Sequence, residues 1–265
     1  MTQLAHWSLS RLPFGPPRKS GDFFAGSPQR EALARLEYLI THGRPVAIVT
    51  GPQSVGRSAL LHYVAGHYWG ISARQTAIWI EPADQPREII DQVAIYLGLP
   101  HVPVAARWRA IFDETATAAR GGARTVLVVD DADIAGEDSL RTLARLIGAC
   151  PAISLIVACR SDRVSTVSAA VGGCPLRVEL SGWSLPEIRD FIQHGLHNAG
   201  CSKAVFTDQG IIRLYELSDG LPGIVSRLAE LALLTGGGCQ AQRVGPELID
   251  AAANELLMQV PLGTS

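Results

Sequence analysis

The segment VAIVTGPQSVGRSALL, from Val46 to Leu61, carries the clearest pattern in the chain. Its first five residues are mostly apolar and rich in β-branched side chains, which predicts a buried strand that ends at Thr50. An octapeptide, Gly51–Ser58, follows, and an apolar helical period begins directly after it. The spacing matches a phosphate-binding loop, G-x-x-x-x-G-K-[ST], except that the lysine of the pattern is Arg57.

Each position of this loop (the Walker A motif) has a chemical reason. Glycine at both ends, Gly51 and Gly56, lets the backbone turn so tightly that its N–H groups point at phosphate oxygens. The helix that follows directs the positive end of its dipole at the same anion. We therefore expect nucleotide binding by Gly51, Pro52, Gln53, Ser54, Val55, Gly56, Arg57, Ser58 and Ala59, with the Ser58 hydroxyl on Mg²⁺.

Arg57 keeps the positive charge of the motif, but its planar guanidinium is larger than an ammonium group and is not interchangeable with it. The chain has only two lysines, Lys19 and Lys203, so a general bias towards arginine accounts for part of this change. The alternative interpretation is an accidental glycine turn between a strand and a helix. The surrounding strand and helix, and the acidic strand described below, favour a nucleotide site.

Composition narrows the class of protein. The chain has 265 residues, of which 47% are hydrophobic and 18% charged, so a substantial globular core is expected. A formal net charge of −2 gives no overall electrostatic argument for nucleic acid. The five cysteines lack metal-ligand spacing, and neither a secretory leader nor a membrane span is evident, so the expected location is the cytoplasm.

Three regions follow from the order of patterns. Residues 1–26, rich in proline and glycine with aromatic insertions, predict an extended N-terminal segment anchored by those aromatics. Residues 27–180 alternate amphipathic helices with apolar strands, which predicts an α/β domain with a parallel sheet covered on both faces. Residues 181–265 open with a capping box at Ser184 and Glu187 and read as an all-helical domain. The strands expected are 46–50, 76–80, 125–129, 153–158 and 176–180.

A second chemical element ends the strand TVLVVDDAD. In phosphate-loop ATPases the first acid after this strand binds Mg²⁺ and the next orients the attacking water. Asp130 is the expected Mg²⁺ ligand and Asp131 the expected catalytic residue. Asp131 is one methylene shorter than the usual glutamate, which is expected to slow hydrolysis. The alternative is that both acids merely cap a turn between strand and helix.

These motifs together resemble the AAA+ ATPases of the ExeA/GspA secretion type, close to the transposition ATPases called TniB. The resemblance covers nearly the whole chain. It includes the opening PF and FF pairs (Phe14, Phe23 and Phe24), the run from Glu31 to Ile40, the phosphate loop, the acidic strand (Walker B) and the lid motif LSDGLPGIVSRLAELALL. The resemblance implies a phosphate-loop AAA+ fold, a three-layer parallel-sheet domain followed by a small helical lid, with ATP and Mg²⁺ bound between core and lid.

Four positions depart from the pattern of that family. The loop lysine is Arg57, the catalytic glutamate is Asp131, and the glutamine that follows it two places on is Asp133. The lid arginine expected after the proline is Gly223. Arg227 stands one helical turn further on, at the motif's asparagine, and the sensor role is not transferred to it. These departures point to weakened or absent hydrolysis.

Two further arginines are left open. Arg160, at the polar end of the 153–158 strand, stands where the family has a first sensor residue, and a simple turn or helix cap explains it equally well. Arg177 falls near the position where the family has an arginine before its last strand, which would act on the phosphate of a neighbouring subunit. A plain surface arginine is the better interpretation.

Three functions remain at this point. The first is an AAA+-type ATP-binding protein with weak hydrolysis coupled to a protein partner or to self-association. The second is a non-hydrolysing regulatory or scaffold subunit that keeps the fold. The third is a DNA-associated transposition-type ATPase, which rests on the resemblance alone.

Overall fold

The computed structural model describes residues 3–15, 20–68 and 75–259. Its contacts divide the chain into two compact units. The α/β unit comprises Gln29–Gln53 and Arg57–Leu180, and the helical unit comprises Met1–Pro28, Ser54–Gly56 and Ser181–Ser265. None of the described helices has the length and hydrophobicity that a bilayer-spanning segment requires.

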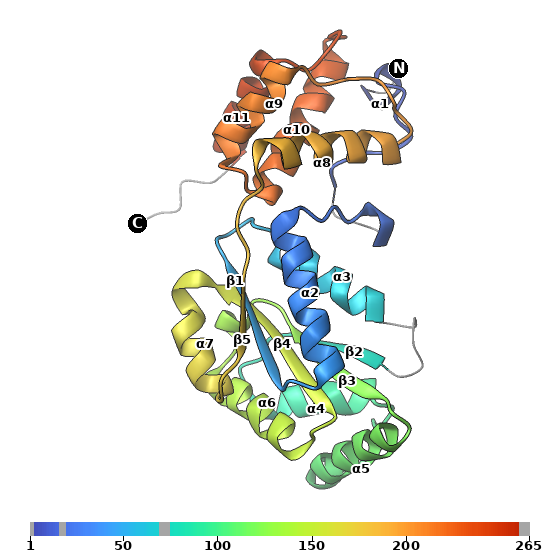
Figure 1. Ribbon diagram of the computed structural model, residues 1–265, viewed down its shortest axis with the longest axis vertical. Coiled ribbons are helices and arrows are strands. Elements are labelled where there is room, and N and C mark those ends of the chain that lie inside the picture. Colours follow the sequence, from blue (N-terminus) through green and yellow to red (C-terminus); the bar gives the residue numbers. More distant parts are fainter. Residues whose placement is uncertain (1–2, 16–19, 69–74, 260–265) are drawn as a thin grey trace. The chain divides into compact units, whose positions relative to one another are not determined.

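Five parallel strands form the sheet of the α/β unit, in the order β2-β3-β4-β1-β5 (Figure 1). All five were predicted, and their ends differ from the prediction by one or two residues. Because β1 pairs with both β4 and β5, its backbone is enclosed and every one of its residues is buried. The strands are β1 (Val46–Gly51), β2 (Gln75–Ile80), β3 (Arg124–Val129), β4 (Ile153–Arg160) and β5 (Leu176–Glu179).

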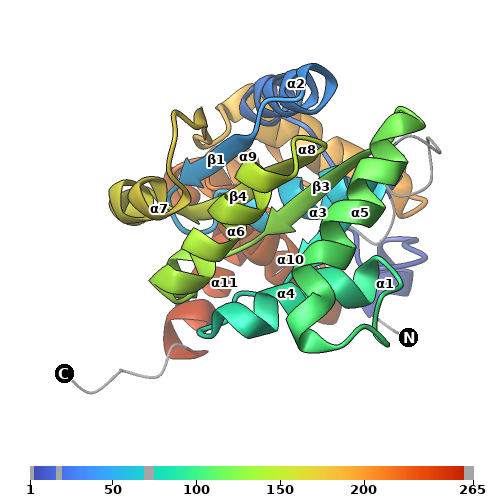
Figure 2. The same cartoon turned by 90° about the horizontal axis from the view of Figure 1, so that it is seen from below.

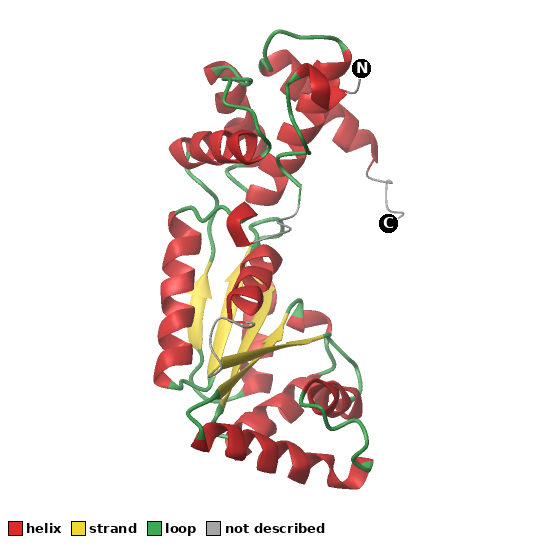
Figure 3. Cartoon of the chain, turned by 90° about the vertical axis from the view of Figure 1, so that its right-hand side faces the viewer, coloured by secondary structure: helices red, strands yellow, loops and turns green. Residues whose placement is uncertain are grey.

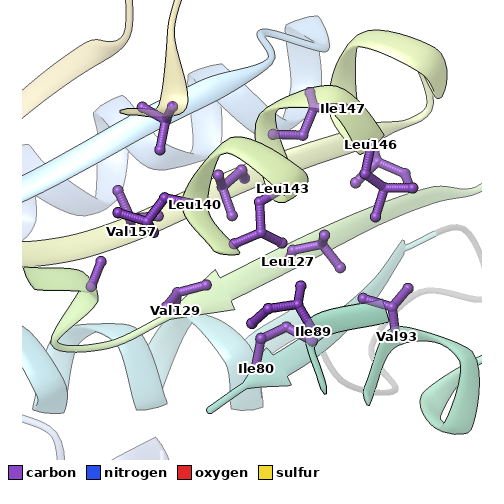
Figure 4. Close-up of a cluster of buried hydrophobic side chains, with 14 of the residues drawn as sticks. Ile80, Ile89, Val93, Leu127, Val129, Leu140, Leu143, Leu146, Ile147 and Val157 are labelled. Carbon is purple, nitrogen blue, oxygen red and sulfur yellow. The ribbon is translucent and has the colours of Figure 1, made fainter. Parts of the chain in front are cut away.

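Helices cover both faces of this sheet (Figure 3). Alternate residues of a strand point to opposite faces, and one face packs its side chains against α4, α6 and α7. In Figure 4, Leu140 and Leu143 of α6 lie against Leu127 and Val129 of β3. The helices on this side are α4 (Pro86–Tyr96), α5 (Arg107–Arg120), α6 (Glu137–Ala149) and α7 (Val164–Val171).

The opposite face is covered by α2 (Ser27–His42) and α3 (Arg57–Tyr68) (Figures 1 and 3). Both helices contribute fully buried leucines, which do not belong to the cluster formed with α4, α6 and α7. These are Leu36 and Leu39 of α2 and Leu60 and Leu61 of α3. Seen from below, α4 and α6 lie side by side, away from α2 (Figure 2). The predicted three-layer parallel-sheet fold is therefore confirmed.

Helix α7 was not predicted. Its sequence, VSTVSAAV, is short and rich in β-branched and small residues, which have weak helix propensity. The fold nevertheless requires a crossover there, because β4 and β5 are parallel strands separated by β1. Val167, Ala170 and Val171 bury the apolar side of the helix in the core.

The helical unit contains four helices of at least three turns within its described part. The predicted capping box is present at the start of α8, where Ser184 and Glu187 bind each other's backbone and side-chain groups. Leu214, Val225 and Ile249 are fully buried in its separate core. The helices are α8 (Leu185–Asn198), α9 (Asp208–Ser218), α10 (Pro222–Gly238) and α11 (Pro246–Gln259).

The N-terminal segment packs with the helical unit. A short helix, α1 (Gln3–His6), precedes Trp7, whose indole N–H donates 2.8 Å to the carbonyl of Leu233 in α10. Gly237 leaves the space for this contact, because a Cβ there would lie 2.6 Å from the Gln3 carbonyl oxygen. Residues 16–19 of the segment lie outside the described chain.

Candidate nucleotide-binding site

The loop predicted to bind phosphate follows β1 at the carboxyl end of the sheet. Helix α3, which follows β1, covers one face, whereas the helices after β2, β3 and β4 cover the other. The chain therefore leaves adjacent strands β1 and β4 towards opposite faces. A reversal of this kind opens a crevice at the carboxyl ends of the strands, and ligands of parallel α/β folds bind there.

The loop has the backbone that a phosphate cradle needs. Gly51 and Gly56 have φ of 158° and 94°, and the latter lies in a region that L side chains rarely adopt. Val55 is fully buried and anchors the loop. Within the described chain, the N–H groups of Gln53, Ser54 and Gly56 donate to no backbone carbonyl, so these donors remain available for an anion.

Most of the other predicted binding residues of the loop are accessible to solvent. Pro52, Gln53 and Ser58 are exposed, and Ala59 is half-buried at the start of α3. The exposed Ser58 side chain belongs to the first turn of that helix, beside the free loop amides. The loop therefore offers an accessible hydroxyl and a helix N-terminus together.

Arg57 turns inward. Its Nη1 donates to the carbonyl oxygen of Gly51 and, at 3.0 Å, to that of Pro52, and the residue is only 9% exposed. Its Nε is buried without a hydrogen-bond partner in the described chain. The guanidinium therefore braces the loop that carries it, an arrangement that the sequence did not predict.

The acidic pair follows β3, with β4 standing between it and β1. Asp130 accepts a hydrogen bond of 2.9 Å from the backbone N–H of Asp131. Asp131 has left-handed backbone angles, φ 44° and ψ 44°, and one carboxylate oxygen lies 3.8 Å from Nη2 of Arg57. The structure thus brings Arg57 and Asp131 together, whereas the side chains of Ser58 and Asp130 form no hydrogen bond within the described part of the chain.

Electrostatics around Asp131 work in both directions. Partial burial raises the pKa of its carboxyl group, the neighbouring Asp130 raises it further, and Arg57 lowers it, with a raised pKa as the result. Burial, assisted by Asp133, also raises the pKa of the Cys159 thiol to about 11. Cys159 therefore remains a neutral thiol at pH 7.

Asp133 forms an ion pair that the sequence analysis missed. Its side chain is 5% exposed and accepts a 3.1 Å bond from Nε of Arg160 at the end of β4. Asp162 lies on the other side of the same nitrogen, at 3.7 Å. The sequence held one signal for this ion pair. Asp133 follows β3 and Arg160 ends β4, and side chains at the carboxyl ends of neighbouring parallel strands lie close together.

Gly223 contacts Ser54, which clusters with the helical unit. The N–H of Gly223 donates 2.8 Å to the Ser54 carbonyl oxygen, and a Cβ at Gly223 would lie 3.1 Å from the Cβ and O atoms of Ser54. Arg227 reaches the Ser54 hydroxyl only at 3.5 Å. Any side chain at position 223 therefore crowds the loop as it stands.

Arg177 is exposed on the edge strand β5, and its carbonyl oxygen accepts a bond from Arg35. The geometry within this single chain gives Arg177 no part in the loop site.

The loop fits the phosphate part of a nucleotide. Its free amides and the N-terminus of α3 are donors, which is the chemistry that binds phosphate oxygens. Among the described residues, no group of three or more histidine, cysteine, aspartate or glutamate side chains is placed to hold a metal ion.

Comparison with known proteins supports the fold. No protein-family model matches the chain. General secretion pathway protein A of Aeromonas hydrophila is 20% identical over 272 aligned positions, which cover 94% of this chain. The chain spans about half of that relative, 48% of its length.

Solved structures share the fold over almost the whole chain. Cdc6p of Pyrobaculum aerophilum is 16% identical, with a TM-score of 0.66 and coverage of 97% of this chain and 74% of its own. The chain therefore has the AAA+ ATPase fold, and its sequence is similar to the ExeA type. A Walker-type ATPase of Pyrococcus abyssi (17% identical, TM-score 0.62, 94% and 80% covered) has the same AAA+ fold. So does RuvB of Thermotoga maritima, a Holliday junction branch migration motor (18%, TM-score 0.57, 92% and 73%).

Proposed function

We propose that this AAA+ protein binds ATP with Mg²⁺ at the loop Gly51–Ala59 and hydrolyses it weakly. The observation that carries the proposal is the set of free loop amides at the start of α3. They supply the positive potential that phosphate oxygens need, whatever the side chain of Arg57 does.

The chain's own residues have distinct parts in this proposal. Ser58 and Asp130 hold Mg²⁺, which neutralises charge on the phosphates when bound. The loop amides orient the phosphates, and Asp131 orients the attacking water as the catalytic residue. Asp131 forms an ion pair with Arg57, so neither side chain is fully available to the attacking water or the phosphates, which supports slow turnover.

A non-hydrolysing regulatory or scaffold subunit is the second candidate. It is supported by Gly223, which has no side chain to offer a γ-phosphate and no room for one beside Ser54. A DNA-associated role, such as that of RuvB, has support only from likeness of fold, and the net charge of −2 adds none.

We also propose the domain limits 27–180 and 181–265 and a cytoplasmic location. We further propose that the nucleotide state controls binding to a protein partner or self-association. Conformational change that depends on the bound nucleotide is a common switching mechanism.

Calorimetric titration with ATP and Mg²⁺, followed by steady-state phosphate release, tests the proposal. We expect binding at submillimolar ligand, weakened by Ser58→Ala only when Mg²⁺ is present. Phosphate release that disappears in Asp131→Asn selects the weak ATPase. Binding without release in either protein selects the non-hydrolysing subunit, and no binding at millimolar ATP refutes both.

A further inference from the structure

Two arginines, Arg57 and Arg160, lie near the acidic residues at the carboxyl end of the sheet, and both already pair with carboxylates. Arg160 lies between Asp133 at 3.1 Å and Asp162 at 3.7 Å. Arg57 donates to loop carbonyl oxygens through Nη1 and faces Asp131 through Nη2. Neither guanidinium therefore offers an uncompensated positive charge to a ligand.

The bracing of Arg57 is directional. Carbonyl oxygens on one side and a carboxylate on the other engage both terminal nitrogens, and the residue is only 9% exposed. A guanidinium donates through a rigid fork, so it cannot keep these partners and also swing towards a distant phosphate. Its remaining donor, Nε, is the one buried without a partner.

The loop amides do not share this restriction. They bind whichever phosphates enter the turn, through the backbone alone. A third phosphoryl group differs from the first two, because it extends beyond the turn and depends on side-chain cations for its additional negative charge. Here Asp131 and Asp133 pair with the two nearby arginines, and Asp130, which has no ion pair among the described residues, adds a carboxylate beside them.

We propose that the ion pair between Arg57 and Asp131 makes this loop a site for nucleoside diphosphate in preference to triphosphate, with Asp131 as the specificity-determining residue. Asp131 holds the loop cation, and the carboxylate of neighbouring Asp130, which has no ion pair among the described residues, repels a third phosphoryl group. The inference rests on the proposed nucleotide site but not on any hydrolysis there.

Equilibrium titration with ADP and with ATP, each with EDTA and again with excess Mg²⁺, tests the proposal. We expect ADP to bind more tightly than ATP in EDTA, by about fivefold, because one more negative charge close to an aspartate has roughly that cost at a partly exposed site. Mg²⁺ should reduce the difference, since it compensates the added charge.

Asp131→Asn is the decisive variant. Its side chain is 55% exposed, so the substitution is compatible with folding, which circular dichroism verifies. We expect the preference for ADP to fall to parity or reverse, mainly through tighter ATP binding. Asp162→Asn is the matched control, because it removes an exposed carboxylate that pairs with Arg160 and not with Arg57.

The outcomes separate the two proposals. Tighter binding of ATP than of ADP by the unmodified protein in EDTA overturns the inference and leaves the nucleotide site intact. The same ADP-to-ATP ratio in Asp131→Asn as in the unmodified protein also overturns it. Failure of both nucleotides to bind refutes the proposed function itself, and the inference with it.

Discussion

Nη2 of Arg57 lies 3.8 Å from a carboxylate oxygen of Asp131, which joins the two positions that depart most directly from an active phosphate-loop ATPase. Considered one at a time, each substitution changes the size or shape of a side chain and keeps the sign of its charge. Considered as a pair, they direct the loop's cation and the expected catalytic acid at each other. This relationship supports the proposal of weak turnover from contacts within the α/β unit alone.

Arg57→Lys should lower the stability of the α/β unit. Lysine has no planar fork, so it cannot reproduce the bonds to the Gly51 and Pro52 carbonyl oxygens together with the contact to Asp131. We expect a loss of about 1–2 kcal/mol in the free energy of unfolding, measured by urea denaturation. Arg109→Lys, at a position 83% exposed, is the control and should leave the midpoint unchanged; an equal loss in both variants would argue against the bracing role.

Ser54→Gly should stabilise the protein. Ser54 has a φ of 65°, a left-handed conformation that costs a residue with a Cβ about 1 kcal/mol and glycine almost nothing. We expect a higher melting temperature for Ser54→Gly in a calorimetric scan. Ser54→Ala, which keeps the Cβ, should show no such gain, and a rise in both would place the effect elsewhere.

Gly223→Ala should destabilise the protein, although alanine is normally the better helix former. The new Cβ would lie 3.1 Å from Ser54, in contact tighter than normal packing allows. Gly66→Ala in α3 is the matched control, because a Cβ there meets nothing within 4 Å and should add about 1 kcal/mol. Thermal melts that rise for both variants would show that α10 has room at position 223. For the same steric reason, Gly223→Arg alone should not restore turnover.

Glu187 should make the helical unit sensitive to acid. Partial burial by itself raises the pKa of this carboxyl group, but bonds from the backbone N–H groups of Ser27 and Ser184 and from their hydroxyls outweigh it and lower the pKa to about 2. A folded pKa below the usual 4.5 gives stability that is present above pH 4.5 and is lost as the pH falls towards 2.

Glu187→Gln tests this dependence. We expect the variant to be less stable by about 1–2 kcal/mol at pH 7, after allowance for solvent screening, and to converge with the unmodified protein near pH 2. Urea midpoints measured at intervals from pH 7 to pH 2 give the comparison. A difference between the proteins that stays constant over this range would contradict the assignment.

Strands β1, β3 and β4 were predictable because each contains a buried, mostly apolar run with abrupt ends, whereas β5 (LRVE) is short and alternates apolar with charged residues. Helix α7 was not, since the propensity of VSTVSAAV is weak and its helical state follows from the crossover between β4 and β5. The positions of the loop and the acidic pair followed from their motifs. The inward turn of Arg57 did not, because it depends on bonds to carbonyl oxygens of its own loop. The pairing of Asp133 with Arg160 did not, because it depends on which side chains meet across the neighbouring strands β3 and β4.

Hydrogen exchange of the loop amides tests the central claim most directly. Peptides that cover Gly51–Leu61 should exchange more slowly when saturating ADP or ATP with Mg²⁺ is added, because the free N–H groups of Gln53, Ser54 and Gly56 would then donate to phosphate oxygens. Peptides from α11 serve as the internal control and should not change. Unchanged exchange of the loop at millimolar nucleotide would contradict the account.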